Sequence, residues 1–152
     1  MIKEKYYALM YNSILGGTAN SKMFQNVREK EGLAYSSKSS FIKQKMNIFV
    51  RCGIQIENYE KALSLIKVQL ENIKNGLFTD EDIEVAKVYL TSSIKNIEEE
   101  QDTEVVYYIG QELSKTNRSV EEYISRIEKV SKDDVLNIAK NVHVNTVYFL
   151  KN

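Results

Sequence analysis

The sequence contains no tryptophan and no proline, one cysteine, one histidine and no net charge, with 21 Lys and Arg against 21 Asp and Glu. A single histidine cannot supply the two imidazoles of an H-E-x-x-H or H-x-x-E-H zinc site. A single cysteine cannot form an internal disulfide or a cysteine-based zinc site. The balanced charge argues against a nucleic-acid-binding protein, because binding to the phosphate backbone needs a basic surplus on some face.

Long apolar runs are also missing. No segment approaches the roughly 20 apolar residues of a membrane span, and the charged residues 1–5 are not followed by the apolar stretch of a secretory signal. The lone Cys52 fits a reducing compartment. These features predict a cytoplasmic protein without a membrane or nucleic-acid partner, whose 152 residues are enough for one domain with a substantial core.

The first third of the chain changes its hydrophobic period. Apolar residues at helical spacing predict helices over 4–15 and 21–30, and Gly32 suits the position that ends the second helix. The period becomes two over 34–42 and 47–56, where β-forming residues are also enriched. This part of the sequence therefore predicts two helices followed by an antiparallel hairpin.

The rest of the chain is mostly helical in pattern. Asn58 is placed to cap the first of these helices, and the polar run 98–102 predicts a break between two later ones. Residues 105–113 carry an apolar helix face. Three further helix starts resemble capping boxes, namely Thr79 with Asp82, Ser119 with Glu122, and Ser131 with Asp134.

In residues 145–151, Val147 and Phe149 alternate with Tyr148 and Leu150, which predicts a final strand. Because strands and helices are segregated, the fold class is predicted as α+β in two layers, an antiparallel sheet with helices packed on one face. Three strands make a small sheet for so many helices, since sheets usually have about 4–6 strands. We therefore expect one domain over 1–152 that lacks its first strand or strands.

The segment 16–22 places two glycines before a helix N-terminus, an arrangement that can bind anions. However, the Walker pattern is not met because no glycine directly precedes Lys22, and the segment follows a helix instead of a strand. A tight turn between two helices is the favoured interpretation.

Three other features have a sufficient structural explanation. His143 follows the last predicted helix, and no Asp, Ser or Cys stands at a local triad spacing. Cys52 lies on the apolar phase of a strand, without an activating neighbour on its face. The run 98–100 lacks the spaced oxygen ligands of a calcium loop, which favours a solvated helix face.

Arg28 and Tyr35 are the most informative pair. Arg28 lies at the end of a predicted helix and Tyr35 at the start of a strand, and a turn at Gly32 can bring both to one sheet edge. A guanidinium beside a phenol can bind or polarise a peptide carbonyl. An equally good interpretation is a surface arginine paired with a glutamate and a packed tyrosine.

Three segments around this pair resemble the insulinase/pitrilysin family of zinc metallopeptidases. They are LGG at 15–17, SKMF at 21–24 and VREKEGLAYS at 27–36. The resemblance is to the second, non-metal-binding homologous domain of that family. It extends over the whole chain and is most specific over 12–36, although Thr18 stands where a third glycine is often found.

The resemblance implies a clamshell of two domains or subunits. One half carries the H-x-x-E-H zinc motif, and the other is a metal-free copy that helps to enclose an extended peptide. The implied chemistry is attack by a zinc-bound water in the partner half. At the matching positions of this chain, Arg28 and Tyr35 would hold the peptide substrate and steady the developing oxyanion. The chain itself would hold no cofactor and have no hydrolase activity alone.

A complete domain of that family begins with one or two strands before its first helix. The resemblance therefore implies that 1–152 is an N-terminally truncated C-terminal domain of a longer peptidase, with a zinc-bearing homologous domain or subunit as its partner. The alternative is an assembly module of an inactive homologue, in which an exposed sheet edge pairs with another copy.

Overall fold

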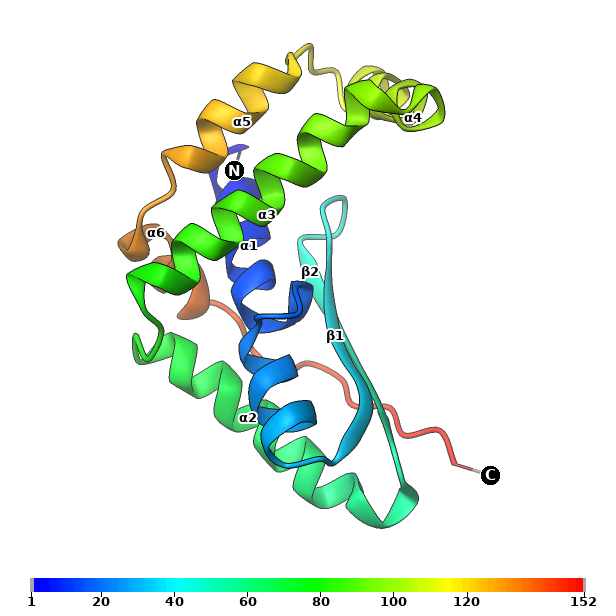
Figure 1. The fold of residues 1–152 in the computed structure, drawn as a ribbon, viewed down its shortest axis with the longest axis vertical. Helices are drawn as coiled ribbons and strands as arrows, with labels where there is room; N and C mark the ends of the chain where they lie inside the picture. Colours follow the sequence, from blue (N-terminus) through cyan, green and yellow to red (C-terminus); the bar gives the residue numbers. More distant parts are fainter. Residues whose placement is uncertain (1, 152) are drawn as a thin grey trace.

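The computed structural model describes residues 2–151, apart from the side chains of residues 2, 3 and 98. Its helices gather on one side of a two-stranded antiparallel hairpin (Figure 1). The elements are α1 (Ile2–Asn12), the π-helical η1 (Ser13–Gly17) and η2 (Phe24–Lys30), β1 (Ala34–Ile42), β2 (Asn47–Ile54), the 3-10 turn η3 (Ile56–Asn58), α2 (Tyr59–Lys74), α3 (Asp80–Glu99), α4 (Gln101–Leu113), α5 (Val120–Glu128) and α6 (Lys132–Ala139).

The first helix forms the centre of the core. Met10 and Tyr11 in α1 and Leu15 in η1 are fully buried, because α1 packs against α3, α5, α6 and β1. The helical layer on one face of the hairpin confirms the predicted α+β class. Within the described residues, no helix has both the length and the apolar character needed to cross a membrane.

The predicted helix starts are present. Reciprocal capping boxes join Thr79 to Asp82 at the start of α3 and Ser131 to Asp134 at the start of α6. Ser119 similarly accepts a hydrogen bond from the N–H of Glu122. In contrast, Asn58 occupies the N-cap position of α2 without a capping hydrogen bond from its side chain.

The break predicted over 98–102 is confirmed. Glu100 has extended backbone angles, φ −121° and ψ 113°, and separates α3 from α4.

The predicted strand over 145–151 is wrong, and the sheet has two strands in the described chain. The last backbone hydrogen bond among the described residues is donated by Val142 to Ala139. A strand forms only where a neighbouring strand completes its ladder. Here the segment is anchored through a side chain instead, with the ring of Phe149 stacked on that of Tyr59 at 4.2 Å between centroids.

The apolar face predicted over 105–113 is present but is not part of the core. Val106, Ile109 and Leu113 are exposed by 69%, 54% and 82%, and α4 has no buried residue. Tyr107 connects the helix to the rest of the chain, since it packs against the core and its hydroxyl donates to the carbonyl of Arg118 at 3.1 Å. Helical periodicity therefore predicted the element correctly but not what covers it.

Candidate functional site

The glycine pair at the end of η1 allows this element to lie directly against β1. A Cβ atom on Gly16 would come within 2.8 Å of the backbone nitrogen of Ser39, and one on Gly17 within 2.9 Å of the side-chain nitrogen of Asn12. The hydroxyl of Ser39 also donates to the carbonyl of Asn12 at 3.2 Å. This close approach explains both glycines as packing residues of a tight turn.

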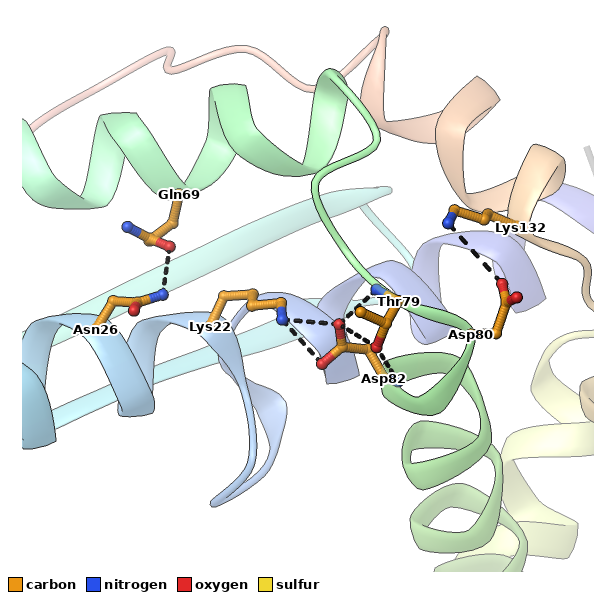
Figure 2. A network of polar contacts seen from close by, with 7 residues as sticks. All are labelled: Lys22, Asn26, Gln69, Thr79, Asp80, Asp82 and Lys132. Carbon is orange, nitrogen blue, oxygen red and sulfur yellow. Dashed lines mark hydrogen bonds and ion pairs between the residues drawn. The ribbon is translucent and has the colours of Figure 1, made fainter.

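Lys22, the cation of the possible anion site, is already paired. Its Nζ lies 2.7 and 2.9 Å from the two carboxylate oxygens of Asp82, at the start of α3 (Figure 2). Burial alone would raise the pKa of Asp82, but the hydrogen bonds from Lys22 and Thr79 outweigh it and hold the pKa below its usual value. The ion pair therefore serves to join two distant segments, and the structure does not support an anion site.

A second polar contact holds η2 to α2. The side-chain nitrogen of Asn26 donates to the amide oxygen of Gln69 at 2.8 Å, and Gln69 is only 3% exposed (Figure 2). Together with the Lys22–Asp82 pair, this contact fixes η2 against the helical layer. The far end of η2, which carries Arg28, is thereby placed at the entry to the hairpin.

Gly32 turns the chain from η2 into β1. Its φ is +61°, in the left-handed region that glycine adopts without a steric penalty, while a Cβ there would meet nothing within 4 Å. The N–H groups of Gly32 and Leu33 donate to the carbonyls of Arg28 and Val27 at 3.0 and 3.3 Å. Glycine is required here by the left-handed backbone conformation and not by a lack of room for a side chain. This agrees with the helix-ending position predicted from the sequence.

Tyr35 is the extra residue of a β-bulge. Ala34 pairs with Ile54 and Ser36 pairs with Gly53, so Tyr35 has no partner of its own in β2. Strict alternation from the buried Ser37 would turn Tyr35 toward the helices. The bulge shifts the phase by one residue and leaves Tyr35 71% exposed. The tyrosine is therefore presented to solvent and is not packed.

Gln55 contacts the hydroxyl of Tyr35. Its side-chain nitrogen donates to that oxygen at 3.1 Å, just beyond the end of β2. Since the phenol accepts this bond, its own proton is available for a further acceptor. Sequence reasoning missed Gln55 because only the strand register, with Ala34 opposite Ile54, brings it beside Tyr35.

Arg28 is held loosely. Its guanidinium carbon lies 4.7 Å from the ring centroid of Phe24, and its Nε is 3.7 Å from a carboxylate oxygen of Glu29. With 42% of the side chain exposed, such an ion pair contributes little. The described contacts of Arg28 do not include Tyr35, so the two side chains lie at the same turn without touching each other.

The other candidate residues do not assemble a reactive centre. Cys52 is partly buried, and burial raises the pKa of its thiol although the hydroxyl of Ser37 opposes the shift. His143 is exposed beyond α6. Among the described residues, no group of three His, Cys, Asp or Glu side chains could hold a metal ion. The residues that the structure describes therefore do not fit the zinc site of a metallopeptidase.

Comparison with known proteins identifies relatives across nearly the whole chain. The family model described as "Peptidase M16 inactive domain" matches residues 2–90. The chain is 32% identical over 149 residues to "Probable inactive metalloprotease YmfF" of Bacillus subtilis strain 168, covering 97% of this chain and 35% of that protein. It is 31% identical over 145 residues to "Uncharacterized zinc protease SCO5738" of Streptomyces coelicolor, covering 91% of this chain and 31% of that protein.

A solved structure shows the same fold. The crystal structure of a conserved protein from Enterococcus faecalis V583 superposes with a TM-score of 0.82 at 34% identity, covering 90% of this chain and 32% of that one. The chain thus spans about a third of the length of the curated relatives it matches. These comparisons confirm the resemblance to a metallopeptidase family and to its inactive half.

Proposed function

The chain belongs to the peptidase M16 inactive-domain family, and on this premise we propose that it binds an extended peptide for a zinc-bearing homologous half. The observation that carries the proposal is the bulge at Tyr35, which turns a phenol with an unused proton out to solvent. Arg28, one glycine turn away, is also exposed and weakly paired. Neither side chain is needed by the core.

The chemistry assigned to this chain is binding and orientation. The phenol of Tyr35 donates to a peptide carbonyl, while Gln55 holds the phenolic oxygen. The guanidinium of Arg28 supplies further N–H donors to the same backbone. Such donors bind more strongly as negative charge develops on the carbonyl oxygen, which favours the transition state over the bound substrate. Zinc, when present, would belong to the partner half and would supply the attacking hydroxide.

Peptide binding to the 152-residue chain tests this assignment. We expect fluorescence anisotropy with a labelled extended peptide to show weak binding. Tyr35→Phe should weaken it about 2–10-fold, the effect of one lost hydrogen bond, and Arg28→Ala should weaken it more because its bonds are charge-assisted. Unchanged affinity in both variants would contradict the proposal.

Two variants serve as matched controls. Tyr148→Phe removes a hydroxyl from a side chain that is 82% exposed outside the site, and Arg126→Ala removes a guanidinium that is bonded to Glu122. Both should leave the affinity unchanged. A zinc-dependent peptidase assay on the chain alone should show no turnover, and robust hydrolysis would contradict the assignment of catalysis to another half.

A second candidate function is assembly through the sheet edge. It is supported by the two-stranded sheet and by the segment after Val142, which has no backbone hydrogen bond among the described residues. Unpaired strand edges are templates for pairing with another chain. Light scattering over a range of concentrations tests it, since a stable dimer would favour assembly and a monomer would leave peptide binding as the better account.

A further inference from the structure

The hairpin carries a net positive charge because it lacks acidic residues. Between Gly32 and Ile56 the sequence has no Asp or Glu, although the chain as a whole is neutral. The same segment has four cationic side chains, Lys38, Lys43, Lys45 and Arg51. A protein of zero net charge whose hairpin has only cationic charged residues attracts negative charge on the hairpin side. The net charge alone does not reveal this.

Two of these cations face each other. Lys38 pairs with Arg51 in the register of β1 and β2, and both are exposed on the sheet face that points away from the helices. Neither has a carboxylate within ion-pair distance among the described residues. Like charges directly opposite each other destabilise a sheet. The fold therefore gains nothing from this pair, which points to a role outside stability.

Lys43 provides an internal contrast. Its Nζ donates to the hydroxyl of Tyr123 in α5 at 2.8 Å, so this cation joins the tip of the hairpin to the helical layer. Within the part of the chain that the structure describes, Lys38 and Arg51 have no comparable hydrogen bond or ion pair with the helices. Arg51 only stacks on its neighbour Phe49, with the guanidinium carbon 4.9 Å from the ring centroid.

The facing cations lie in line with the proposed peptide site. Along the outward face, the Tyr35–Gln55 contact comes first, then the small pair Ser36 and Gly53, and then the pair formed by Lys38 and Arg51. Alternate residues of a strand are about 7 Å apart, the same spacing as alternate side chains of an extended peptide. A peptide that is held at Tyr35 and extends along the hairpin would therefore bring its next hairpin-facing side chains close to Lys38 and Arg51.

We infer that the outward face of the hairpin selects acidic peptides, with Lys38 and Arg51 receiving Asp or Glu side chains next to the residue held at Tyr35. This inference rests on the proposed function and specifies its substrate class. Charge complementarity is the reason for an acidic occupant, since this hairpin contains no acid. Nucleic acid fits less well, because phosphate-backbone affinity comes from many cationic contacts, and the described part of this face offers the single facing pair Lys38 and Arg51.

The test compares two labelled peptides of equal length. One has Glu at alternate positions and the other has Gln at the same positions. We expect the 152-residue chain to bind the Glu peptide about 3–10-fold more tightly at low salt, as one or two solvent-exposed charge pairs allow. The difference should shrink at about 0.3 M salt, where screening is stronger.

Variants of Lys38 and Arg51 test whether these two cations cause the preference for the Glu peptide. The double variant Lys38→Gln with Arg51→Gln should bind both peptides alike. The control Lys67→Gln with Lys140→Gln, which removes the same charge from two exposed positions on α2 and after α6, should keep the preference. The double variant Lys38→Glu with Arg51→Glu should bind a peptide with Lys at the alternate positions more tightly than the Glu peptide. Thermal melts check that each variant is folded.

The possible failures are distinguishable. Equal affinity for the Glu and Gln peptides, or a preference that survives loss of both cations, overturns acidic selection while leaving peptide binding intact. If Arg28→Ala and Tyr35→Phe leave the affinity for the Gln peptide unchanged, the proposed function itself fails. Competition by a single-stranded oligonucleotide that binds more tightly than the Glu peptide would reassign the face to nucleic acid. No binding of either peptide at millimolar concentration would reject both proposals.

Discussion

The stretches 15–27 and 28–35 follow one another in the sequence but have opposite surroundings. In the first, Leu15, Met23 and Val27 are fully buried. In the second, Arg28 and Tyr35 are exposed. A single turn at Gly32 separates the last helical residues from the strand.

The difference shows which residues the fold needs. In 15–27, several polar or small residues have a structural explanation, such as the Lys22 ion pair and the close approach at Gly16. In 28–35, the polar groups of Arg28 and Tyr35 make only weak or partial contacts. A family signature can therefore combine residues kept for packing with residues available for recognition. Substitutions in 15–27 should therefore lower the free energy of unfolding, whereas substitutions at exposed positions should change it little.

The largest effect is expected from Leu15→Ala. Leu15 is fully buried, so truncation removes apolar contacts and leaves a cavity that costs about 2–5 kcal/mol of unfolding free energy. Urea denaturation measures the change. Leu113→Ala makes the same substitution at a side chain that is 82% exposed and should change stability by less than about 0.5 kcal/mol. Equal losses of unfolding free energy in Leu15→Ala and Leu113→Ala would contradict the contrast between buried and exposed positions.

The next largest effect is expected from Gly16→Ala. The added Cβ would lie 2.8 Å from the backbone nitrogen of Ser39, and the resulting shift between η1 and β1 should cost about 1–3 kcal/mol in unfolding free energy. Gly110→Ala is the matched control in α4, where a Cβ meets nothing within 4 Å. It should stabilise the chain by about 0.5–1 kcal/mol through better helix propensity. A neutral Gly16→Ala variant would show that η1 and β1 can separate freely.

Asp82→Asn tests the link between 15–27 and α3. Loss of the carboxylate weakens the bond to Lys22 and the capping box, which should lower the unfolding free energy by about 1–2 kcal/mol at neutral pH. Asp133→Asn, also in the first turn of a helix but exposed, should have a smaller effect.

The same pair should make stability depend on pH. Because the pKa of Asp82 is lowered from 3.8 in the folded state, its contribution is present above about pH 4 and is lost as the pH falls through the folded pKa. Acid titration of the unfolding free energy should therefore show a steeper decrease below about pH 4 in the wild type than in Asp82→Asn. Parallel curves would contradict a stabilising Lys22–Asp82 pair.

The smallest effect, and one of opposite sign, is expected on the outward face of the hairpin. Lys38→Glu replaces a like-charge partner of Arg51 with an opposite one and should stabilise the chain by about 0.2–1 kcal/mol. A thermal melt at low salt measures the gain, which should shrink when salt is added. A loss of stability would mean that Lys38 contributes to the stability of the fold, as the buried residues of 15–27 do.

Local sequence rules predicted much of the fold. The boxes at Thr79 and Ser131 form as expected, because a capping residue and its partner lie within one turn. Gly32 adopts the expected left-handed conformation. The hairpin also follows from alternation over short spans. The predicted turn at Gly32 placed Arg28 and Tyr35 on either side of it, and the structure adds how each is held.

Long-range contacts explain what was missed. The segment 145–151 alternates like a strand, but no strand lies beside it to complete a ladder in the described chain. The face over 105–113 repeats like a core helix, yet no other element of the described chain covers it. Periodicity reports which side of an element is apolar and cannot report whether a neighbour is present.

By itself, the sequence determined the helix boundaries set by capping residues, the turn at Gly32, the hairpin and the family. Each of these depends on interactions within a few residues or on a contiguous motif. The tertiary structure alone decided that Lys22 pairs with Asp82, that a bulge turns Tyr35 outward beside Gln55, and that Lys38 faces Arg51. Those outcomes depend on strand register and on packing between segments distant in the chain, which bring together residues that no local pattern relates.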